Sequence, residues 1–205
     1  MKLEAAKMGW MELHALIGNA VAPLPIAFIS TVSPEGTYNA APYSFFAPVC
    51  SKPPIVCISM GLKRGQKKDT ARNIEATGDF VVNSVDEGIL KQVIQASADY
   101  PYGVDEIKAT GLTGVKGERV KSPRIAEAKV SLECKLVHKV DFLEQYKDVQ
   151  RPPVILFGEV VLAHIKEDVW VDGRVDPRRL KSIGRVGTNL YSRPGEIFEL
   201  KPSGI

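Results

Sequence analysis

The feature that most constrains the fold is a long alternation of apolar and polar residues over 130–140. Its inward set is Val130, Leu132, Cys134, Leu136, His138 and Val140, and the polar residues Ser131, Glu133, Lys135 and Lys139 lie between them. Because successive side chains of a strand point to opposite faces, this pattern is typical of a half-buried antiparallel strand. A second, almost wholly apolar run over 154–165 predicts a buried strand. Long strands with few helical patterns favour a mainly β fold, a β-barrel with helical insertions, over a doubly wound sheet.

The composition fits one globular domain. The chain has 205 residues, of which 44% are hydrophobic and 25% are charged. This is enough for one full core, whereas two domains would both be small. We therefore expect a single domain over 1–205, with residues 1–20 as a peripheral N-terminal segment that contains a short helix over 9–18.

The charge pattern favours a small anionic ligand. The formal charge of +3 is too small to indicate a nucleic-acid partner, and most of the basic excess lies in residues 63–68 and 174–185. No apolar run reaches the roughly 18 residues that a membrane span needs, and no secretory signal is recognisable. Three cysteines without a CxxC pair predict neither a disulfide framework nor a zinc site. We expect a reduced, cytoplasmic protein without a membrane partner.

Several common site motifs are absent from the sequence. It contains no G-x-G-x-x-G after a strand, no Walker loop and no G-x-S-x-G elbow. The three histidines are scattered, no His, Cys or Glu cluster has metal-ligand spacing, and no carboxylate pair stands out. These absences argue against a standard dinucleotide site, a metal site and acid–base hydrolysis.

Residues 67–70 (KKDT) predict a seat for a phosphate. They lie at the start of a helix expected over 69–77, with Asp69 as its cap and Gly78 as its end. The first N–H groups of a helix are unpaired, and the dipole favours an anion there by roughly 0.3–1 kcal/mol. Lys68 adds a charge and Thr70 adds a hydroxyl donor. The alternative is an ordinary helix start beside surface lysines.

Residues 39–46 (NAAPYSFF) are expected to form a loop of small, hydroxyl and aromatic residues after a strand. Asn39 and Ser44 can donate hydrogen bonds, and Phe45 and Phe46 can wall an aromatic ring, although core packing is the commoner role of such rings. Further along, Ser59 and Gly61 end a buried strand, where the glycine permits the close approach of a ligand or is simply part of a turn.

Two later segments hold further candidate residues. His164 lies on an apolar strand face, where a lone histidine is more often a satisfied core residue than a catalyst. Arg185 and Tyr191 lie in a glycine-marked segment near the end of the chain. The arginine can bind an anion through two parallel hydrogen bonds, or it can form a structural ion pair in a surface loop.

In this order, these segments resemble the flavin reductase-like family of FMN-binding split barrels, which includes flavoredoxins. The resemblance covers about residues 20–192. The matching segments are residues 25–32 (PIAFISTV), 39–46 (NAAPYSFF), 68–74 (KDTARNI), 78–83 (GDFVVN), 100–106 (YPYGVDE), 158–161 (GEVV) with His164, and 184–187 (GRVG) with Tyr191.

The resemblance implies a homodimer with FMN in a groove between its subunits. It implies that the flavin ring and ribityl chain lie beside Ser30, Thr31, Val32, Asn39, Ser44, Phe45 and Phe46, with Ser59 and Gly61 at the border of the site. It assigns the phosphate to Lys68, Thr70 and Asn73, and it places His164, Arg185 and Tyr191 near the flavin.

The function implied is redox chemistry on the flavin, with NADH or NADPH passing hydride to it. An NAD(P)H-dependent flavin reductase is the first hypothesis, with a small-molecule electron donor or acceptor. A flavoredoxin-type electron carrier, reduced by a redox protein partner, is the second. A non-enzymatic split-barrel binding module is the third. No side chain is expected to act as a strong acid or base.

Overall fold

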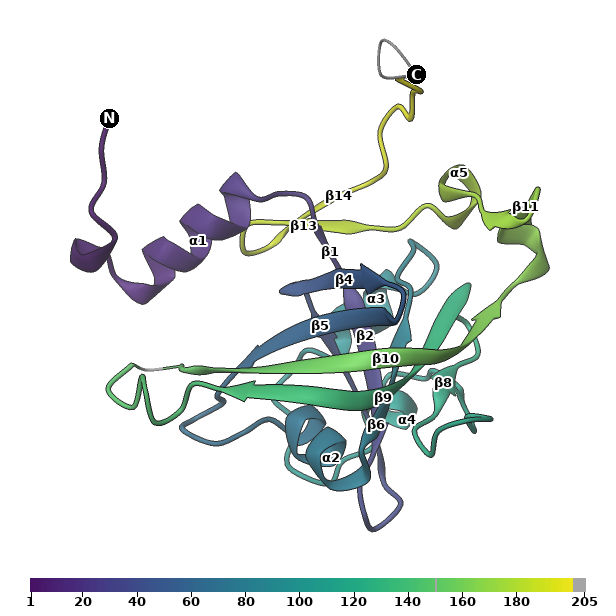
Figure 1. The fold of residues 1–205 in the computed structure, drawn as a ribbon, viewed down its shortest axis with the longest axis horizontal. Coiled ribbons are helices and arrows are strands. Elements are labelled where there is room, and N and C mark those ends of the chain that lie inside the picture. The colour runs from purple at the N-terminus through teal and green to yellow at the C-terminus, as the bar shows by residue number, and fades with distance from the viewer. Residues whose placement is uncertain (150, 201–205) are drawn as a thin grey trace.

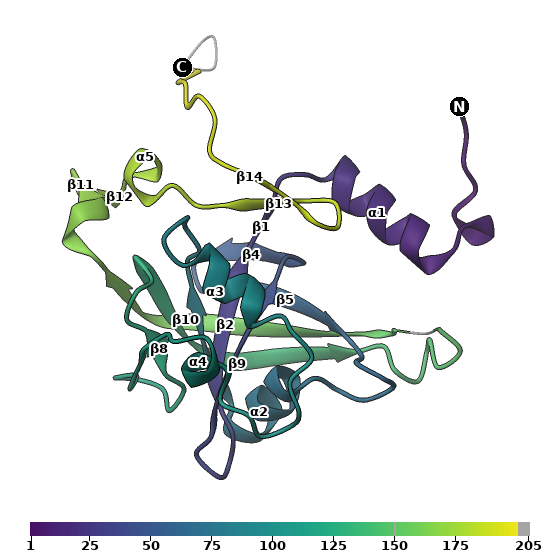
Figure 2. The ribbon, with the colours of Figure 1, turned by 180° about the vertical axis from the view of Figure 1, so that it is seen from behind.

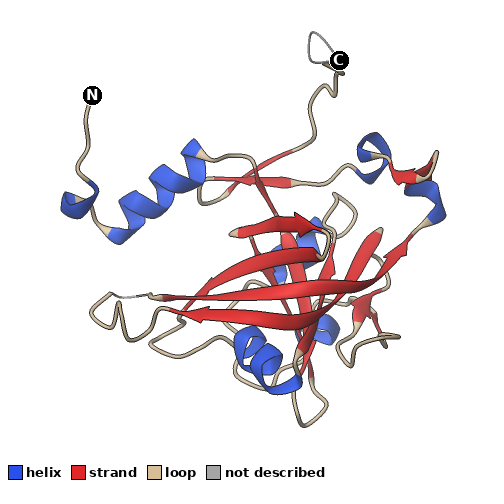
Figure 3. Cartoon of the chain, viewed as in Figure 1, coloured by secondary structure: helices blue, strands red, loops and turns tan. Residues whose placement is uncertain are grey.

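A computed structural model of the chain describes residues 1–149 and 151–200, and its main element is a seven-stranded antiparallel sheet. The strands follow the order β3-β2-β6-β9-β10-β5-β4. Their bounds are β2 (Ala27–Val32), β3 (Tyr38–Tyr43), β4 (Phe46–Ser51), β5 (Pro54–Gly61), β6 (Asp79–Asn83), β9 (Val130–Asp141) and β10 (Pro153–Ile165). Figure 1 shows these strands as the body of the molecule, and Figure 3 shows that the helices lie around them.

The sheet curls into a barrel because its two edge strands are consecutive in the chain. Only Ser44 and Phe45 separate the end of β3 from the start of β4. A link of this length spans at most about 10 Å, so the two edges lie close together. The N–H of Ser59 on β5 also donates to the carbonyl of Phe45 at 2.9 Å. The link between β3 and β4 therefore marks the seam of the barrel.

The two long strands predicted from the alternation are confirmed as β9 and β10. They pair along almost their whole length, from Val154 opposite Asp141 to Ile165 opposite Val130. The register shifts between Phe157 and Gly158, which locally bends the pair and helps the sheet to close. The expected mainly β fold with helical insertions is therefore correct.

Gly158→Ala is expected to destabilise the barrel. A Cβ atom there would lie 2.3 Å from Cζ of Phe80, a side chain with no exposed surface. Overpacking of this kind costs about 1–3 kcal/mol, so the free energy of unfolding should fall by that amount in urea titrations. Gly195→Ala is the control, because no heavy atom lies within 4 Å of its added Cβ. Equal stability of the two variants would contradict the close packing at Gly158.

The helices and the shorter strands surround the barrel. The helices are α1 (Trp10–Ala20), α2 (Asp69–Thr77), α3 (Leu90–Gln95), α4 (Glu106–Ala109) and α5 (Pro177–Leu180), with 3₁₀ turns η1 (Ala5–Lys7) and η2 (Glu167–Val169). The short strands are β1 (Leu24–Pro25), β7 (Gly114–Val115), β8 (Arg124–Ile125), β11 (Trp170–Val171), β12 (Arg174–Val175), β13 (Gly184–Val186) and β14 (Leu190–Ser192). Both Figure 1 and Figure 2 show α1 beside the β13–β14 hairpin, outside the barrel. In the described residues, no helix is long and apolar enough to cross a membrane.

Two hydrophobic cores hold the fold together. Inside the barrel, Ile29, Ile58 and Leu156 pack around Phe80 and against Ile74 of α2. A second core lies on the outer side of β2 and β3, where Phe28 packs with residues of α3 and α4. Because α2 is fixed to the barrel by buried side chains, its first turn has a defined position relative to β2 and β3.

The expected loop over 39–46 is wrong for most of its length. β3 continues to Tyr43, so that only Ser44 and Phe45 remain irregular before β4. β3 is an edge strand, where a proline such as Pro42 costs no ladder hydrogen bond on its open side. The segment around Arg185 is likewise a β13–β14 hairpin, in which Arg185 pairs with Tyr191.

Candidate functional site

The start of α2 is the clearest anion-binding feature of the described chain. Lys68 is the N-cap residue, and its side chain makes no capping hydrogen bond. The first helical bond runs from the N–H of Arg72 to the carbonyl of Lys68, at 3.1 Å. The three N–H groups before Arg72 therefore have no partner within the helix and form the positive end of its dipole. The expected cap at Asp69 is wrong because Asp69 is already the first helical residue, whereas the expected end is confirmed by the left-handed Gly78.

A cavity of about 330 Å³ lies against this first turn. It is lined by the small residues of β3, by the loop that follows β5, and by Lys63, Arg64, Lys68 and Arg151. Lys63 and Arg64 both form ion pairs with Asp99, which also lines the cavity. Among the described residues, Lys68 and Arg151 form no ion pair with a carboxylate, so these two cations remain available to an anion.

Lys68 is held in a desolvated and electropositive position. Its Nζ atom lies 5.0 Å from the ring centroid of Tyr43. Burial lowers the pKa of Lys68, and the nearby charges of Arg151, Lys63 and Arg185 lower it further. Each of these effects disfavours the charged ammonium group. An anion placed among these side chains would relieve the repulsion, and the residues therefore fit a phosphate.

A buried polar network lies behind the cavity. Asn39 is at its centre: its Oδ1 atom accepts hydrogen bonds from Thr70 at 2.9 Å and from Thr31 at 3.1 Å. Its Nδ2 atom donates to both carboxylate oxygens of Glu106, at 3.1 and 3.0 Å. Asn73 donates to Thr31 at 3.0 Å. The four predicted site residues are thus brought together, but their side chains bond to one another, and their contact with a ligand stays a prediction.

The buried carboxylate of Glu106 completes this network. Besides Asn39, it accepts a hydrogen bond from the backbone N–H of Ala40 at 3.3 Å. Burial raises the pKa of Glu106 above that of an ordinary carboxyl, although the hydrogen bonds to its backbone, to Ala40 and to Asn39 oppose this shift. The network joins β2, β3, α2 and α4, and it fixes the N-terminus of α2 against the sheet.

A second group of predicted residues meets at the seam of the barrel. The Nη1 atom of Arg185 donates to the hydroxyl of Ser44 at 3.4 Å. Phe45 is 38% exposed, and its carbonyl binds the N–H of Ser59. Gly61 lies on β5, like Ser59, and is beside Arg151. Tyr191, which pairs with Arg185, is also exposed. Of these predicted residues, Gly61 adjoins the cavity at α2 through Arg151, and the contact of the others with a ligand stays a prediction.

Two predicted residues lie in the interior of the chain, and a third is partly buried. The Ser30 side chain has no exposed surface; it donates to the carbonyl of Pro123 and accepts from Asn83. Val32 is 8% exposed, and Phe46 packs against the core inside the barrel. Ser30 and Val32 therefore offer little open surface to a flavin ring in this chain, and the contact of all three residues with a ligand stays a prediction.

His164 lies at the other end of β10 from this site. Its Nε2 atom is 2.7 Å from the buried carboxylate of Glu133, which also accepts hydrogen bonds from the backbone N–H groups of Glu118 and Arg119. Ten residues of extended strand lie between it and Pro153, opposite Gly61, a span on the order of 30 Å. Within one chain, His164 therefore lies far from Arg151 and from the part of the cavity that Arg151 lines.

The sequence reasoning missed several residues of this region. Arg151 comes from the loop between β9 and β10, and Glu106 comes from α4; neither lies in a local motif with the helix start. Trp10 and His14 come from α1, which was expected to be only peripheral, yet Arg151 lies over the Trp10 ring and His14 lies against Phe45. The one sequence signal for Trp10 and His14 is their spacing of four residues, which places two aromatic side chains on the same face of a helix.

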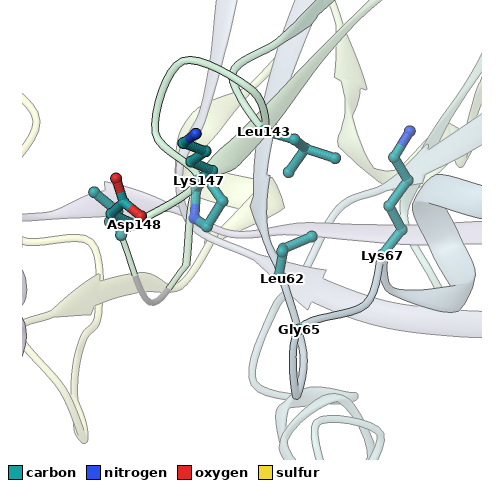
Figure 4. A pocket seen from close by; sticks show the side chains of 8 residues that line it. Leu62, Gly65, Lys67, Leu143, Lys147 and Asp148 are labelled. Atoms are coloured by element: carbon teal, nitrogen blue, oxygen red, sulfur yellow. The ribbon is translucent and has the colours of Figure 1, made fainter.

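A larger hollow of about 570 Å³ lies on the other side of the loop after β5. Figure 4 shows its side chains, with Lys67 and Lys147 on opposite sides of the hollow. Lys67 pairs with Glu75 at 2.9 Å and with Asp141 at 3.3 Å. Because the charge of Lys67 is already compensated, the smaller cavity at Lys68 is the better candidate for an anionic ligand. No cluster of three or more potential metal ligands occurs in the part of the chain that the structure describes.

Comparisons with known proteins find a consistent likeness. The model of the flavin reductase like domain matches residues 20–177. An uncharacterized protein of Halalkalibacterium halodurans, BH2278, is 37% identical over 201 residues, which cover 98% of this chain and 95% of that protein. The crystal structure of nitrilotriacetate monooxygenase component B from Bacillus cereus has a TM-score of 0.92 and 32% identity, and the match covers 98% of each chain.

A more distant structure identifies the architecture. A Shewanella frigidimarina protein with a split barrel domain matches with a TM-score of 0.84 and 21% identity, over 99% of this chain and 100% of that one. At this identity the likeness concerns the fold alone. The closed sheet with its seam between β3 and β4 is accordingly a split barrel, as the resemblance implied.

Proposed function

The chain belongs to the flavin reductase-like family, and from this premise we propose that it is an FMN-binding oxidoreductase that accepts hydride from NADH or NADPH. The observation that carries the proposal is the uncapped start of α2, which opens into a cavity beside Lys68 and Arg151, two cations without carboxylate partners among the described residues. A mononucleotide has one phosphate and one planar ring, and this site offers an anion seat next to an aromatic seam.

The residues present fit the phosphate of such a cofactor. The free N–H groups of the first turn of α2 would donate to its oxygens, and Lys68 and Arg151 would compensate its charge. The phenolic oxygen of Tyr43 and the Oδ1 atom of Asn73 are buried and have no hydrogen-bond partner among the described residues, which leaves unused polar groups near this turn. Thr70 supports the seat from behind through its bond to Asn39.

The residues at the seam would position the ring of the cofactor. Ser44 can donate a hydrogen bond to a ring heteroatom, and Phe45 presents an apolar surface beside it. When bound, the flavin supplies the redox chemistry, because it can accept hydride from a nicotinamide. The protein then has to orient two planar groups and shield them from water, which agrees with the lack of an acid–base pair in the sequence.

We further propose that the site is completed in a homodimer. His164 can approach a flavin bound near Lys68 only from a second subunit, since it lies at the far end of β10 in its own chain. The edge strand β4 and the helix α1 also expose apolar side chains, among them Met11, Ile17 and Val49. A second copy would cover such surfaces. The protein would work in the cytoplasm, with a small molecule or a redox protein as its further partner.

Anaerobic reduction of the FMN-loaded protein tests the proposed function. NADH or NADPH is expected to bleach the visible absorbance of the flavin within seconds to minutes, since hydride transfer reduces the ring. Dithionite is the control, because it reduces any bound flavin chemically. A protein that is bleached by dithionite and not by either nicotinamide would be an electron carrier of the flavoredoxin type, and one that takes up no FMN would contradict the proposal.

A further inference from the structure

Three aromatic rings form a stack beside the seam, defined here as Trp10, His14 and Phe45. The rings of Trp10 and His14 lie 5.1 Å apart at an angle of 13°, and the rings of His14 and Phe45 lie 5.7 Å apart at 47°. Trp10 is 39% exposed and Phe45 is 38% exposed, so the stack is not a closed core. It brings the helix α1 to the link between β3 and β4, two parts of the chain that the barrel alone does not join.

Two arginines flank this aromatic stack. The Cζ atom of Arg151 lies 4.7 Å from the ring centroid of Trp10. Arg185 donates to Ser44 and to the carbonyl of Thr188, at 2.8 Å, while its Nε atom is buried without a hydrogen-bond partner. Within the described residues, neither guanidinium forms an ion pair with a carboxylate. The charges of both guanidinium groups are therefore uncompensated among the described residues, and an anionic ligand would compensate them.

The electrostatics of His14 agree with this arrangement. Burial lowers its pKa, and the positive charges of Arg185 and Arg151 lower it further. His14 is therefore neutral at neutral pH and acts in the stack as an aromatic ring. The same two arginines also lower the pKa of Lys68, so the aromatic stack and the cavity at α2 share one electropositive region.

We propose that the aromatic stack and its two arginines form a binding site for a planar aromatic carboxylate. Its ring would lie against the exposed part of Trp10, which leaves Phe45 to the flavin ring, and its carboxylate would accept hydrogen bonds from Arg151 and Arg185. An arginine that stacks on an aromatic face keeps its in-plane N–H groups free, and their fork matches the two oxygens of a carboxylate. A purely apolar ligand would leave the charges of both guanidinium groups without a carboxylate partner among the described residues.

This site adjoins the proposed flavin site and shares Arg151 with its phosphate seat. Arg151 lines the cavity at α2 and also contacts Trp10, so a ligand on the stack would lie next to the mouth of that cavity. The interpretation of this ligand as a second substrate rests on the proposed function. The binding site itself depends only on the chain's own side chains, and it can therefore be tested without flavin.

The indole N–H signals of the protein's two tryptophans allow a direct test by NMR. Trp10 reports on the aromatic stack, whereas the comparably exposed Trp170 on β11 is an internal control. The signals are assigned with Trp170→Phe. Benzoate is the probe, and benzamide is its uncharged control. We expect benzoate to shift the Trp10 signal to saturation at low-millimolar concentrations and to leave Trp170 unshifted, and benzamide to bind at least about tenfold more weakly.

Arg151→Lys separates a specific site from general attraction of anions. It keeps the positive charge and loses the planar fork, so benzoate affinity should fall about tenfold or more. Three results would overturn the proposal. They are the absence of a saturable shift of the Trp10 signal, equal shifts of both tryptophan signals, and equal affinities of the protein for benzoate and benzamide. Loss of the benzoate effect in FMN-saturated protein would overturn it as well, because the stack would then be the seat of the flavin ring. Benzoate binding in a protein that takes up no FMN would contradict the proposed function and leave this site standing.

Discussion

Lys68→Ala is expected to weaken FMN binding by about 1.5–3 kcal/mol, which is about a 10- to 150-fold rise in the dissociation constant. The ammonium group lies at the open start of α2, beside Arg151, and it has no carboxylate partner among the described residues. A charge-assisted bond to a phosphate is lost without replacement. Titration of the apoprotein, followed by quenching of FMN fluorescence, measures the change.

Lys67→Ala is the matched control for this variant. The neighbouring lysine carries the same charge, but it is paired with Glu75 and Asp141. Although burial alone works against its charge, these hydrogen bonds raise the pKa of Lys67 above the usual value. Its removal should change FMN affinity by no more than about twofold, through long-range charge alone. Equal losses of FMN affinity in Lys68→Ala and Lys67→Ala would show that general positive charge, and not the helix start, holds the phosphate.

Asn39→Ala is expected to lower the free energy of unfolding by about 3–5 kcal/mol. The side chain is 6% exposed and bonds to Thr31, Thr70 and both oxygens of Glu106. Its removal leaves a buried carboxylate with fewer donors and two hydroxyl groups without their acceptor. Asn19→Ala is the control, because Asn19 is exposed and its amide bonds only to the backbone of its own helix at 2.8 Å. Urea titration measures the free energy of unfolding of Asn39→Ala and of Asn19→Ala.

The loss of folding stability in Asn39→Ala should depend on pH. Burial already holds the pKa of Glu106 above its ordinary value, and the hydrogen bond from Asn39 opposes that shift. A carboxyl with a raised folded-state pKa stabilises the fold below its unfolded-state pKa, and this contribution disappears as the pH rises through the folded-state pKa. Without Asn39 the pKa rises further, so the variant should be more strongly destabilised at neutral pH than at acidic pH. A pH-independent loss would contradict the role assigned to Glu106.

The barrel could be predicted because its strands carry local signals. The alternation around Cys134 and the apolar run before His164 define β9 and β10 from the sequence alone, and Gly78 marks the end of α2. β4 has no such pattern, since five of its residues in a row are exposed and one is a proline. Its pairing with β5 is decided by closure of the barrel, which is a tertiary effect.

The site was predicted only in part because its charges come from distant segments. The start of α2 is a local motif, and Lys68 could be found from it. Arg151 follows a polar loop more than eighty residues later, and Glu106 lies on a helix of four residues. The sequence also could not indicate that Asn39 and Thr70 bond to each other, since a polar side chain after a strand is equally suited to a ligand and to a buried network.

The central claim is that the first turn of α2, with Lys68, holds a phosphate group. The affinities of the wild-type protein and of Lys68→Ala for FMN and for riboflavin test it most directly, because the two ligands differ only in that group. The wild-type protein should prefer FMN, and Lys68→Ala should lose most of this preference while its affinity for riboflavin stays the same. An unchanged ratio of the two affinities in Lys68→Ala would contradict the claim.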